Sequence, residues 1–506
     1  MPISRNDASR FLAQASLGAT ASEIASVQQL GYAGWLEQQF ALAPTESRVA
    51  WLRRKGFDAI DNQQSDRGFD ASSWRKLLSS PDTLRQRVAL ALSEILVVGI
   101  DGLDAGKWPA FTGAAYQDLL EANAFGNYRT LLERVTTSPA MGEYLTYRGN
   151  SKANTISGAQ PDENYARELM QLFTIGLIKL NPDGSPALVN GATQPTYSQS
   201  DILGLARVWT GWTYDFADGN RDTPDYKVRP MRQDKSNHEY GAKTFLGITI
   251  PEGTDGVQSM RVALDTLFNH ANVGPFIGRQ LIQRLVTSNP SRGYVQRVAS
   301  AFADNGSGIR GDLKAVIRAI LLDDEARTLP VSAGAGKLRE PMLRFIHIAR
   351  MLSVASPSDD WRVSNTSSPA FALAQSPLRS ASVFNFFRPG YTPPNTATGS
   401  AGLVSPELQL ADASSVLGYV NFIRNFLFSP SNSNDVRANT GALVTQAANG
   451  TQLVAELNTL LAAGQLSATN AADIASAIDS MPANAANRVN TAITLIAAAP
   501  EYIVLR

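Results

Sequence analysis

The amino-acid sequence predicts an all-α protein: a large multi-helix single body with long loops and a minor β-ribbon. Most apolar residues recur with the 3.6-residue period of a helix, and helix-start and helix-stop residues bracket many of these segments. A parallel sheet would need several strands alternating with helices, and this pattern is missing from the chain. The 506 residues suit roughly two to four domains or one large one, and they are enough to bury a sizeable core.

Glycine, proline and small polar residues mark the ends of the expected helices. Residues 21–30 and 32–40 predict two short helices separated by Gly31. Ser80-Pro81-Asp82 opens a helix over 83–98, with proline in its first turn. Ser198 and Asp201 have the spacing of a capping box before a helix over 202–209.

Strand signals are few and weak. Residues 243–250, with the sequence KTFLGITI, give the best strand prediction, and residues 188–189 predict a small ribbon. Residues 180–197, 214–242 and 353–369 are expected to be long loops. Loops of that length in a compact protein are usually functional or disordered.

The composition changes near residue 429. Alanine, asparagine, serine and threonine become frequent, and helices are expected over 451–463, 467–480 and 484–498. The segment 429–435, SPSNSND, resembles a connector. We therefore divide the chain into a main helical domain, residues 1–430, and C-terminal helices, residues 431–506, that dock on it.

The composition also excludes several classes of protein. The 45 Lys and Arg balance 45 Asp and Glu, so no net charge attracts a nucleic acid. The chain has no cysteine and only three widely spaced histidines, so we expect no metal site. Dinucleotide and phosphate-loop motifs are missing, so no cofactor is expected. The apolar stretch 88–100 is interrupted by Ser93 and Glu94 and is too short to span a membrane.

The amphipathic segment 161–177 supplies the first candidate catalytic residues. Tyr165 belongs to its apolar face, whereas Glu163, Arg167 and Glu168 share the polar face. An ordinary solvated face with a Glu163–Arg167 ion pair explains this pattern. The functional interpretation instead places Arg167 and Glu168 at the wall of a cleft.

Three further segments supply candidate partners for this helix. Trp209 and Trp212 precede a long loop, where they predict either a sugar-stacking surface or an anchor for the loop. His238 and Lys243 close that loop, and a loop histidine is either an acid–base catalyst or a solvated side chain. Arg388 lies among aromatic residues and predicts either a guanidinium clamp for a ligand or a buried plug.

Together these segments resemble the bacterial domain-of-unknown-function family 1800. The similarity is carried by residues 163–177, 197–202, 209–212, 238, 243–247, 279–282 and 337–341, and by 8–12 and 30–36 near the N-terminus. The chain departs from the usual pattern at Gln280, where a lysine is common, and at residues 386–390. The resemblance implies a secreted or periplasmic protein whose signal peptide has been removed, and an exported partner protein of family 1501. It implies no established reaction.

Two functions fit these observations, and whether the protein is an enzyme stays open. The first is hydrolysis of a glycan or cell-envelope polymer, with Glu163 or Glu168 as acid or base and Asp201 as the second carboxylate. Such chemistry needs two carboxylates about 5–10 Å apart with pKa values pushed in opposite directions. Trp209 and Trp212 would stack the sugar, with Lys243 and Arg388 also binding substrate.

The alternative is a non-enzymatic helical binding or scaffold protein that acts with the exported partner. In that case the polar face of 161–177 is a docking surface. An oxidoreductase with a bound cofactor is a weaker third hypothesis, because the sequence contains no recognisable cofactor ligands. Convergence of Arg167, Glu168, Asp201 and His238 on one pocket would favour the enzyme.

Overall fold

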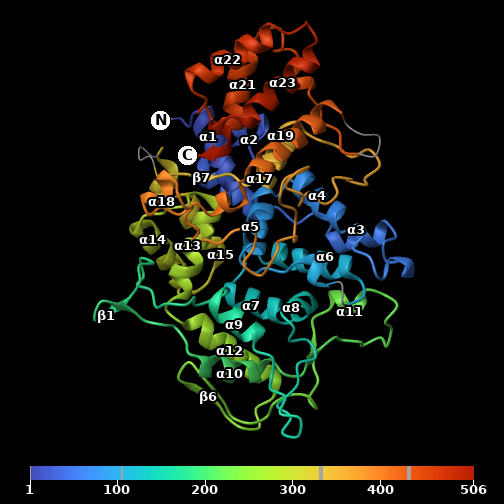
Figure 1. Cartoon of the computed structure of the whole chain (residues 1–506), viewed down its shortest axis with the longest axis vertical. Helices are drawn as coiled ribbons and strands as arrows, with labels where there is room; N and C mark the ends of the chain where they lie inside the picture. Colours follow the sequence, from blue (N-terminus) through green and yellow to red (C-terminus); the bar gives the residue numbers. More distant parts are fainter. Residues whose placement is uncertain (1, 104–105, 330–333, 430–434) are drawn as a thin grey trace.

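The computed structural model describes residues 2–103, 106–329, 334–429 and 435–506, and it confirms the mainly α-helical class (Figure 1). Helices account for 52% of the protein, and the described residues form 24 α-helices. Strands form only two-stranded sheets within these ranges. Residues 430–434 of the expected connector lie outside the described residues.

The helices run through the molecule in three consecutive sets. The first set is α1 (Arg5–Ala15), α2 (Ala21–Ala41), α3 (Arg48–Arg54), α4 (Phe69–Ser79), α5 (Thr83–Ser93) and α6 (Pro109–Ala122). The second is α7 (Tyr128–Thr136), α8 (Pro139–Tyr144), α9 (Asn164–Gln171), α10 (Gln199–Ala206), α11 (Asp225–Val228), α12 (Gly256–Asn269), α13 (Val273–Leu285), α14 (Arg292–Ala303), α15 (Leu313–Leu321) and α16 (Asp324–Arg327). The third is α17 (Pro341–Met351), α18 (Ala397–Ser400), α19 (Ala413–Phe428), α20 (Gly441–Val444), α21 (Gly450–Ala462), α22 (Ala468–Asp479), α23 (Ala485–Ala498) and α24 (Pro500–Ile503). Short 3-10 turns add η1 (Ile60–Asn62), η2 (Ile100–Leu103), η3 (Arg207–Trp209) and η4 (Pro406–Leu410).

Four antiparallel pairs of short strands accompany the helices. They are β1 (Leu188–Val189) with β2 (Ala192–Thr193), β3 (Trp212–Thr213) with β4 (Arg232–Gln233), β5 (Lys243–Phe245) with β6 (Ile248–Ile250), and β7 (Lys337–Leu338) with β8 (Val504–Leu505). The ribbon expected at 188–189 is confirmed, but the single strand expected over 243–250 is wrong. That segment is a hairpin, because Leu246 and Gly247 both have positive φ, 47° and 76°, as a tight two-residue hairpin turn requires.

Two helix ends also differ from the sequence prediction. The helix expected over 161–177 is confined to α9, because the backbone N–H of Phe173 bonds to the carbonyl of Glu168 and Gly176 adopts a φ of 69°. The helix expected over 83–98 ends at Ser93. The break expected at Gly31 is confirmed, since this residue has a φ of 71° inside α2.

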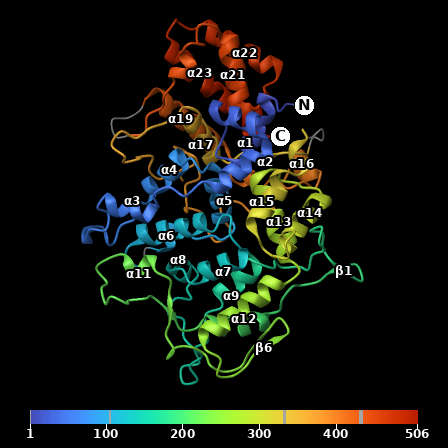
Figure 2. The same cartoon turned by 180° about the vertical axis from the view of Figure 1, so that it is seen from behind.

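The C-terminal helices pack directly on the N-terminal part of the chain. Helix α21 lies beside α1, α23 lies beside α19, and α22 packs on α21 and α23; both chain ends are at this side (Figures 1 and 2). Arg5 forms an ion pair of 2.6 Å with Glu456, and the Arg339 guanidinium donates to the Leu461 carbonyl at 3.2 Å. Strand β8 closes the chain by pairing with β7. Contacts far apart in the sequence thus connect the C-terminal helices to the body.

A continuous hydrophobic core fills the space between the helices. Five tryptophans are almost fully buried: Trp35, Trp51, Trp74, Trp108 and Trp209. Among the described helices, none is both long enough and apolar enough to cross a membrane.

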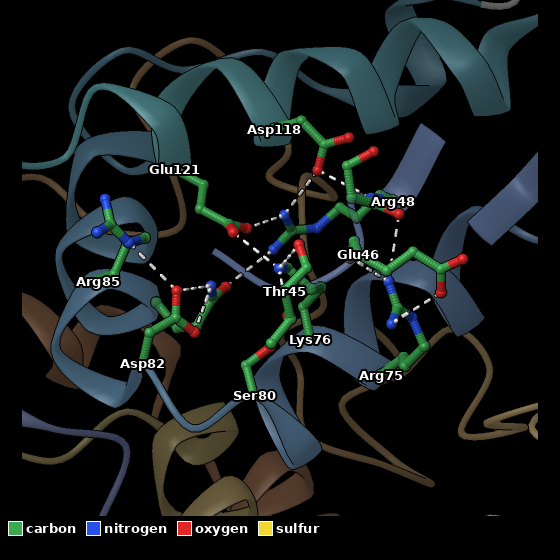
Figure 3. Close-up of polar contacts among 12 residues, drawn as sticks. Thr45, Glu46, Arg48, Arg75, Lys76, Ser80, Asp82, Arg85, Asp118 and Glu121 are labelled. Carbon is green, nitrogen blue, oxygen red and sulfur yellow. Dashed lines mark hydrogen bonds and ion pairs between the residues drawn. The ribbon is translucent and has the colours of Figure 1, made fainter. Parts of the chain in front are cut away.

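A buried network of charges joins four helices of the first set (Figure 3). The Glu121 carboxylate on α6 accepts hydrogen bonds of 2.7 Å from Arg48 on α3 and makes a 2.7 Å ion pair with Lys76 on α4. Lys76 also donates to the Thr45 hydroxyl at 2.9 Å, and Asp82 at the start of α5 lies 3.2 Å from Arg85. Because each charge has a partner, we assign this network a structural role, in which it holds the four helices together.

Candidate functional site

The structure places Glu163 and Arg167 together on the surface at the start of α9. The Glu163 carboxylate accepts hydrogen bonds of 2.9 Å from the Arg167 guanidinium and 2.9 Å from the Gln199 amide. Both members of the ion pair are about one-third exposed. This geometry gives them the properties of a helix surface pair, worth a few tenths of a kcal/mol.

Glu168 lies on the buried side of α9. Its side chain is largely enclosed, and its Oε2 accepts no hydrogen bond from any described residue. Burial raises the pKa of Glu168, and the positive charge of Arg167 opposes this effect. The enclosed carboxyl is therefore easier to protonate than a solvated glutamate.

Asp201 has a local structural role at the start of α10. It completes the predicted capping box with Ser198: its Oδ2 accepts from the Ser198 N–H at 2.7 Å, and the Ser198 hydroxyl faces the Asp201 N–H. Its other oxygen accepts from the Leu246 N–H in the β5–β6 turn at 2.7 Å. Both carboxylate oxygens are thus used to hold the backbone.

We expect Asp201→Ala to lower the free energy of unfolding by about 0.5–2 kcal/mol, the usual effect of removing a helix cap. The reason is that three backbone and side-chain donors lose their acceptor. Urea denaturation measures this change. Unchanged stability together with a loss of enzymatic turnover would instead support the catalytic role predicted from the sequence.

His238 and Lys243 are buried close to each other. The His238 Nδ1 lies 3.1 Å from the Thr210 carbonyl, so Nδ1 carries the proton and Nε2 is the free acceptor. Neither His238 Nε2 nor Lys243 Nζ has a hydrogen-bond partner among the described residues. Burial lowers the pKa of both groups, and the charge of Lys243 lowers that of His238 further. His238 is therefore neutral at pH 7.

The predicted residues have different charged neighbours. The charged side chains that shift the pKa of His238 are Lys243 and Glu239, whereas the one that shifts the pKa of Glu168 is Arg167. Asp201 is committed to its backbone contacts. Convergence of all four residues on one pocket therefore stays a prediction.

Trp209 and Trp212 belong to the hydrophobic core. They are 0% and 2% exposed, and the Trp209 ring packs edge-on against Tyr165 at a centroid distance of 5.2 Å. Trp212 lies in β3, which pairs with β4. Neither ring presents a face on which a sugar could stack, so the anchoring alternative fits the geometry.

Arg388 differs from these residues, because it lines a pocket. The pocket encloses about 440 Å³ between the end of α5, the end of α9 and its following turn, α13, and residues 383–390. This volume lies within the roughly 300–1,000 Å³ typical of small-molecule sites. Figures 1 and 2 show these helices around the middle of the molecule.

The walls of this pocket are mainly apolar. The apolar lining comes from Ile95, Leu172, Leu177, Ile178, Phe276 and Val383, among others. Helix α13 contributes a polar edge, because Phe276, Arg279, Gln280 and Gln283 recur at spacings of three and four residues and thus share one face. The Gln280 Nε2 and Gln283 Oε1 atoms are buried without a hydrogen-bond partner among the described residues. The wall of the pocket on this side therefore contains one donor and one acceptor that are buried and without a partner.

Glu94, directly after α5, is among the residues that line the pocket, and both of its carboxyl oxygens are buried. Its side chain is nearly buried, and the Arg284 guanidinium Nε lies 3.4 Å from it. Its two oxygens accept no hydrogen bond from described donors. Burial and the neighbouring Glu340 carboxylate raise the pKa of Glu94 well above its ordinary value. The Glu94 carboxyl is therefore much easier to protonate than a solvated glutamate.

Glu340 is the ionised partner behind Glu94. Although burial acts to raise its pKa, the hydrogen bond shared with Glu94, the charges of Lys337 and Arg87, and a hydrogen bond from Gln375 lower the pKa of Glu340 overall. The Gln375 amide donates to Glu340 at 2.7 Å. Glu340 also precedes the first turn of α17, where the helix dipole favours a negative charge. The pKa values of the two carboxyl groups are thus shifted in opposite directions.

The family model described as "Protein of unknown function (DUF1800)" matches residues 10–504, nearly the whole chain. The chain belongs to the DUF1800 family. The resemblance found in the sequence motifs is therefore confirmed. A search of curated proteins and a search of solved structures found no match to this DUF1800 protein.

The Glu94–Glu340 pair is the part of this DUF1800 protein that sequence reasoning missed. Glu94 interrupts the apolar run ALALSEILVV, and a single acid in such a run signals a buried, functional or paired carboxyl. We interpreted it only as a break in a membrane-like stretch. Glu340 lies in the motif 337–341, which the sequence connects only with the family resemblance. The motif residues 337–341 also gave no indication that they contact α5.

The raised pKa of Glu94 predicts a pH dependence of folding in this DUF1800 protein. At a pH above 4.5, the ordinary pKa of a glutamate, Glu94 loses its proton in the unfolded chain but keeps it in the folded chain. The free energy of unfolding therefore falls by up to about 1.4 kcal/mol per pH unit until the pH reaches the pKa of Glu94 in the folded protein. Glu94→Gln removes this loss. We expect the variant to gain stability relative to the parent as pH rises from 5 to 8, as measured by urea denaturation. A difference that does not change with pH would contradict the raised pKa.

Proposed function

We propose that this DUF1800 protein is a hydrolase whose active site is the pocket lined by Glu94, Gln280 and Gln283. The observation that carries the proposal is the buried Glu94 carboxyl at the wall of an apolar pocket, whose pKa is raised well above its ordinary value by burial and by the neighbouring Glu340. A carboxyl group that keeps its proton at neutral pH can act as a general acid.

The proposed reaction uses water as the nucleophile. The residues that line the pocket include no serine, threonine or lysine, and the chain has no cysteine. Glu94 transfers its proton to the oxygen of the leaving group as the bond to that oxygen breaks. The attacking water then gives one proton back to Glu94, so the enzyme returns to its starting state. Overall, one substrate bond is broken, and the atoms of one water molecule are divided between the two products.

The surrounding side chains support each stage of this reaction. When Glu94 becomes an anion, the Arg284 guanidinium at 3.4 Å stabilises its charge. The free amide donor of Gln280 is suited to hydrogen-bond an oxygen on which negative charge develops, and the free acceptor of Gln283 to orient the water. Glu340 acts through Glu94 by sharing its proton and is a positioning residue.

The proposal is thus still a hydrolase with paired carboxyl groups, as the sequence predicts, but the pair is Glu94 and Glu340. Glycan and envelope-polymer substrates, the extracytoplasmic location and the exported partner of family 1501 stay predictions. The non-enzymatic scaffold function stays the alternative, and it predicts that substituting Glu94 leaves the function unchanged.

A substrate panel tests the proposal. Purified protein is assayed at neutral pH against aryl esters, aryl glycosides and aryl phosphates, beside its Glu94→Gln variant. We expect hydrolysis of at least one class by the parent and its loss in the variant. Equal rates for the two proteins on every substrate would contradict the proposal and favour the scaffold.

A further inference from the structure

The mouth of the pocket carries two arginines with no counter-charge. Arg279 on α13 and Arg388 in the segment 383–390 both line the pocket and are exposed. Neither guanidinium makes an ion pair or hydrogen bond with any residue that the structure describes. The Arg388 guanidinium lies over the Phe384 ring, 5.0 Å from its centroid, which orients it.

The remaining charges of the pocket do not neutralise this pair. The other charged lining residues are Arg284 and Glu94, whose side chains lie 3.4 Å apart. An ionised Glu94 only offsets Arg284, and a protonated Glu94 leaves Arg284 as a further positive charge, so neither state neutralises Arg279 and Arg388. The pocket therefore combines apolar walls with a mouth of net positive charge. Guanidinium groups in this position match carboxylate and phosphate groups through paired hydrogen bonds.

We infer that the substrate is an anionic amphiphile, with an apolar body inside the pocket and a carboxylate or phosphate group held by Arg279 and Arg388. This inference rests on the proposed function and deepens it. The anion stays at the mouth, so the scissile bond of the apolar part reaches Glu94. A neutral polysaccharide would leave both arginines unpaired and would meet mostly apolar walls.

Binding of short amphiphiles tests the inference without any need for turnover. Isothermal titration calorimetry compares octanoate, octyl phosphate and the neutral octanamide on the parent protein and on Arg279→Gln, Arg388→Gln and the double variant. Arg261→Gln, an exposed arginine on α12 that does not line the pocket, is the matched control. We expect at least one anion to bind about tenfold more tightly than octanamide, and each pocket variant to remove most of that preference.

The results distinguish a phosphate ligand from a carboxylate ligand. They also distinguish failure of the anion site from failure of the proposed hydrolase function. Tighter binding of octyl phosphate would identify a phosphate group, and tighter binding of octanoate a carboxylate; both agree with the inference. Equal binding of the anions and octanamide, no binding of any probe, or anion binding unchanged in the double variant would overturn it. Glu94→Gln should keep the anion preference. If it does so while no hydrolysis is found, the proposed function fails and the anion site stands.

Discussion

Glu94→Gln is expected to lower kcat of the hydrolysis by about 10²–10⁴-fold, the usual contribution of a general acid. Glutamine has nearly the shape of a protonated glutamate and can still donate a hydrogen bond to Glu340, so the fold should persist. It cannot release a proton to a leaving group. Steady-state kinetics on the best panel substrate measure the change, and circular dichroism checks the fold.

The pH profile adds a second readout to this prediction. Activity of the parent should fall at high pH, because Glu94 must be protonated to act as an acid. Glu340→Gln should move this decline to lower pH, since removal of the neighbouring negative charge lowers the pKa of Glu94. A decline at the same pH in both proteins would show that Glu340 does not control the acid.

Glu168→Gln provides a matched comparison. Like Glu94, Glu168 is an enclosed glutamate whose pKa is raised by burial and whose Oε2 has no described donor. It does not line the pocket. The proposal therefore expects nearly unchanged kcat. A large loss in Glu168→Gln, with little change in Glu94→Gln, would return the active site to α9, where the sequence first placed it.

Glu121→Leu is expected to lower the free energy of unfolding by about 3–5 kcal/mol, the usual effect of stranding a buried charge. The substitution removes the carboxylate that both Arg48 and Lys76 contact at 2.7 Å (Figure 3). Lys76 then keeps only the Thr45 oxygens as partners. Urea or thermal denaturation gives the value.

An exposed glutamate on a neighbouring helix is the control for this prediction. Glu133 pairs with Arg129 at 2.8 Å on α7 and is 38% exposed. Glu133→Leu should therefore change stability by less than about 1 kcal/mol. Similar losses of unfolding free energy in the two variants would show that burial does not determine how much the Arg48–Glu121–Lys76 network contributes to stability.

Local features of the fold were predictable from the sequence. The buried face of α9 follows from the spacing of Tyr165, Leu169 and Phe173, and the Ser198–Asp201 capping box and the break at Gly31 depend on neighbouring residues only. These features are set within one or two turns of chain. Helix ends were less predictable, because the hydrogen bonds that end α9 compete closely with helix continuation.

The candidate site could be predicted only in part. Arg388 was identified because its aromatic neighbours are adjacent in the sequence, and it does line the pocket. Glu94 directly follows α5, and Glu340 directly precedes α17. Their segments are far apart in the sequence, and the spacing of apolar residues does not reveal that two such segments are neighbours in the fold. Asp201 and Glu163 are among the catalytic residues predicted from the sequence. Their carboxylates instead hold the backbone and a surface arginine, which only the tertiary contacts reveal.

The proton held by Glu94 is the central claim, and infrared difference spectroscopy tests it most directly. Spectra of the parent protein and of Glu94→Gln are recorded in D₂O at neutral pH and subtracted. We predict that the parent shows the carbonyl band of a protonated carboxylic acid, and that this band is missing from the variant. If the subtraction shows only the loss of a carboxylate, Glu94 is ionised and cannot be the proton donor.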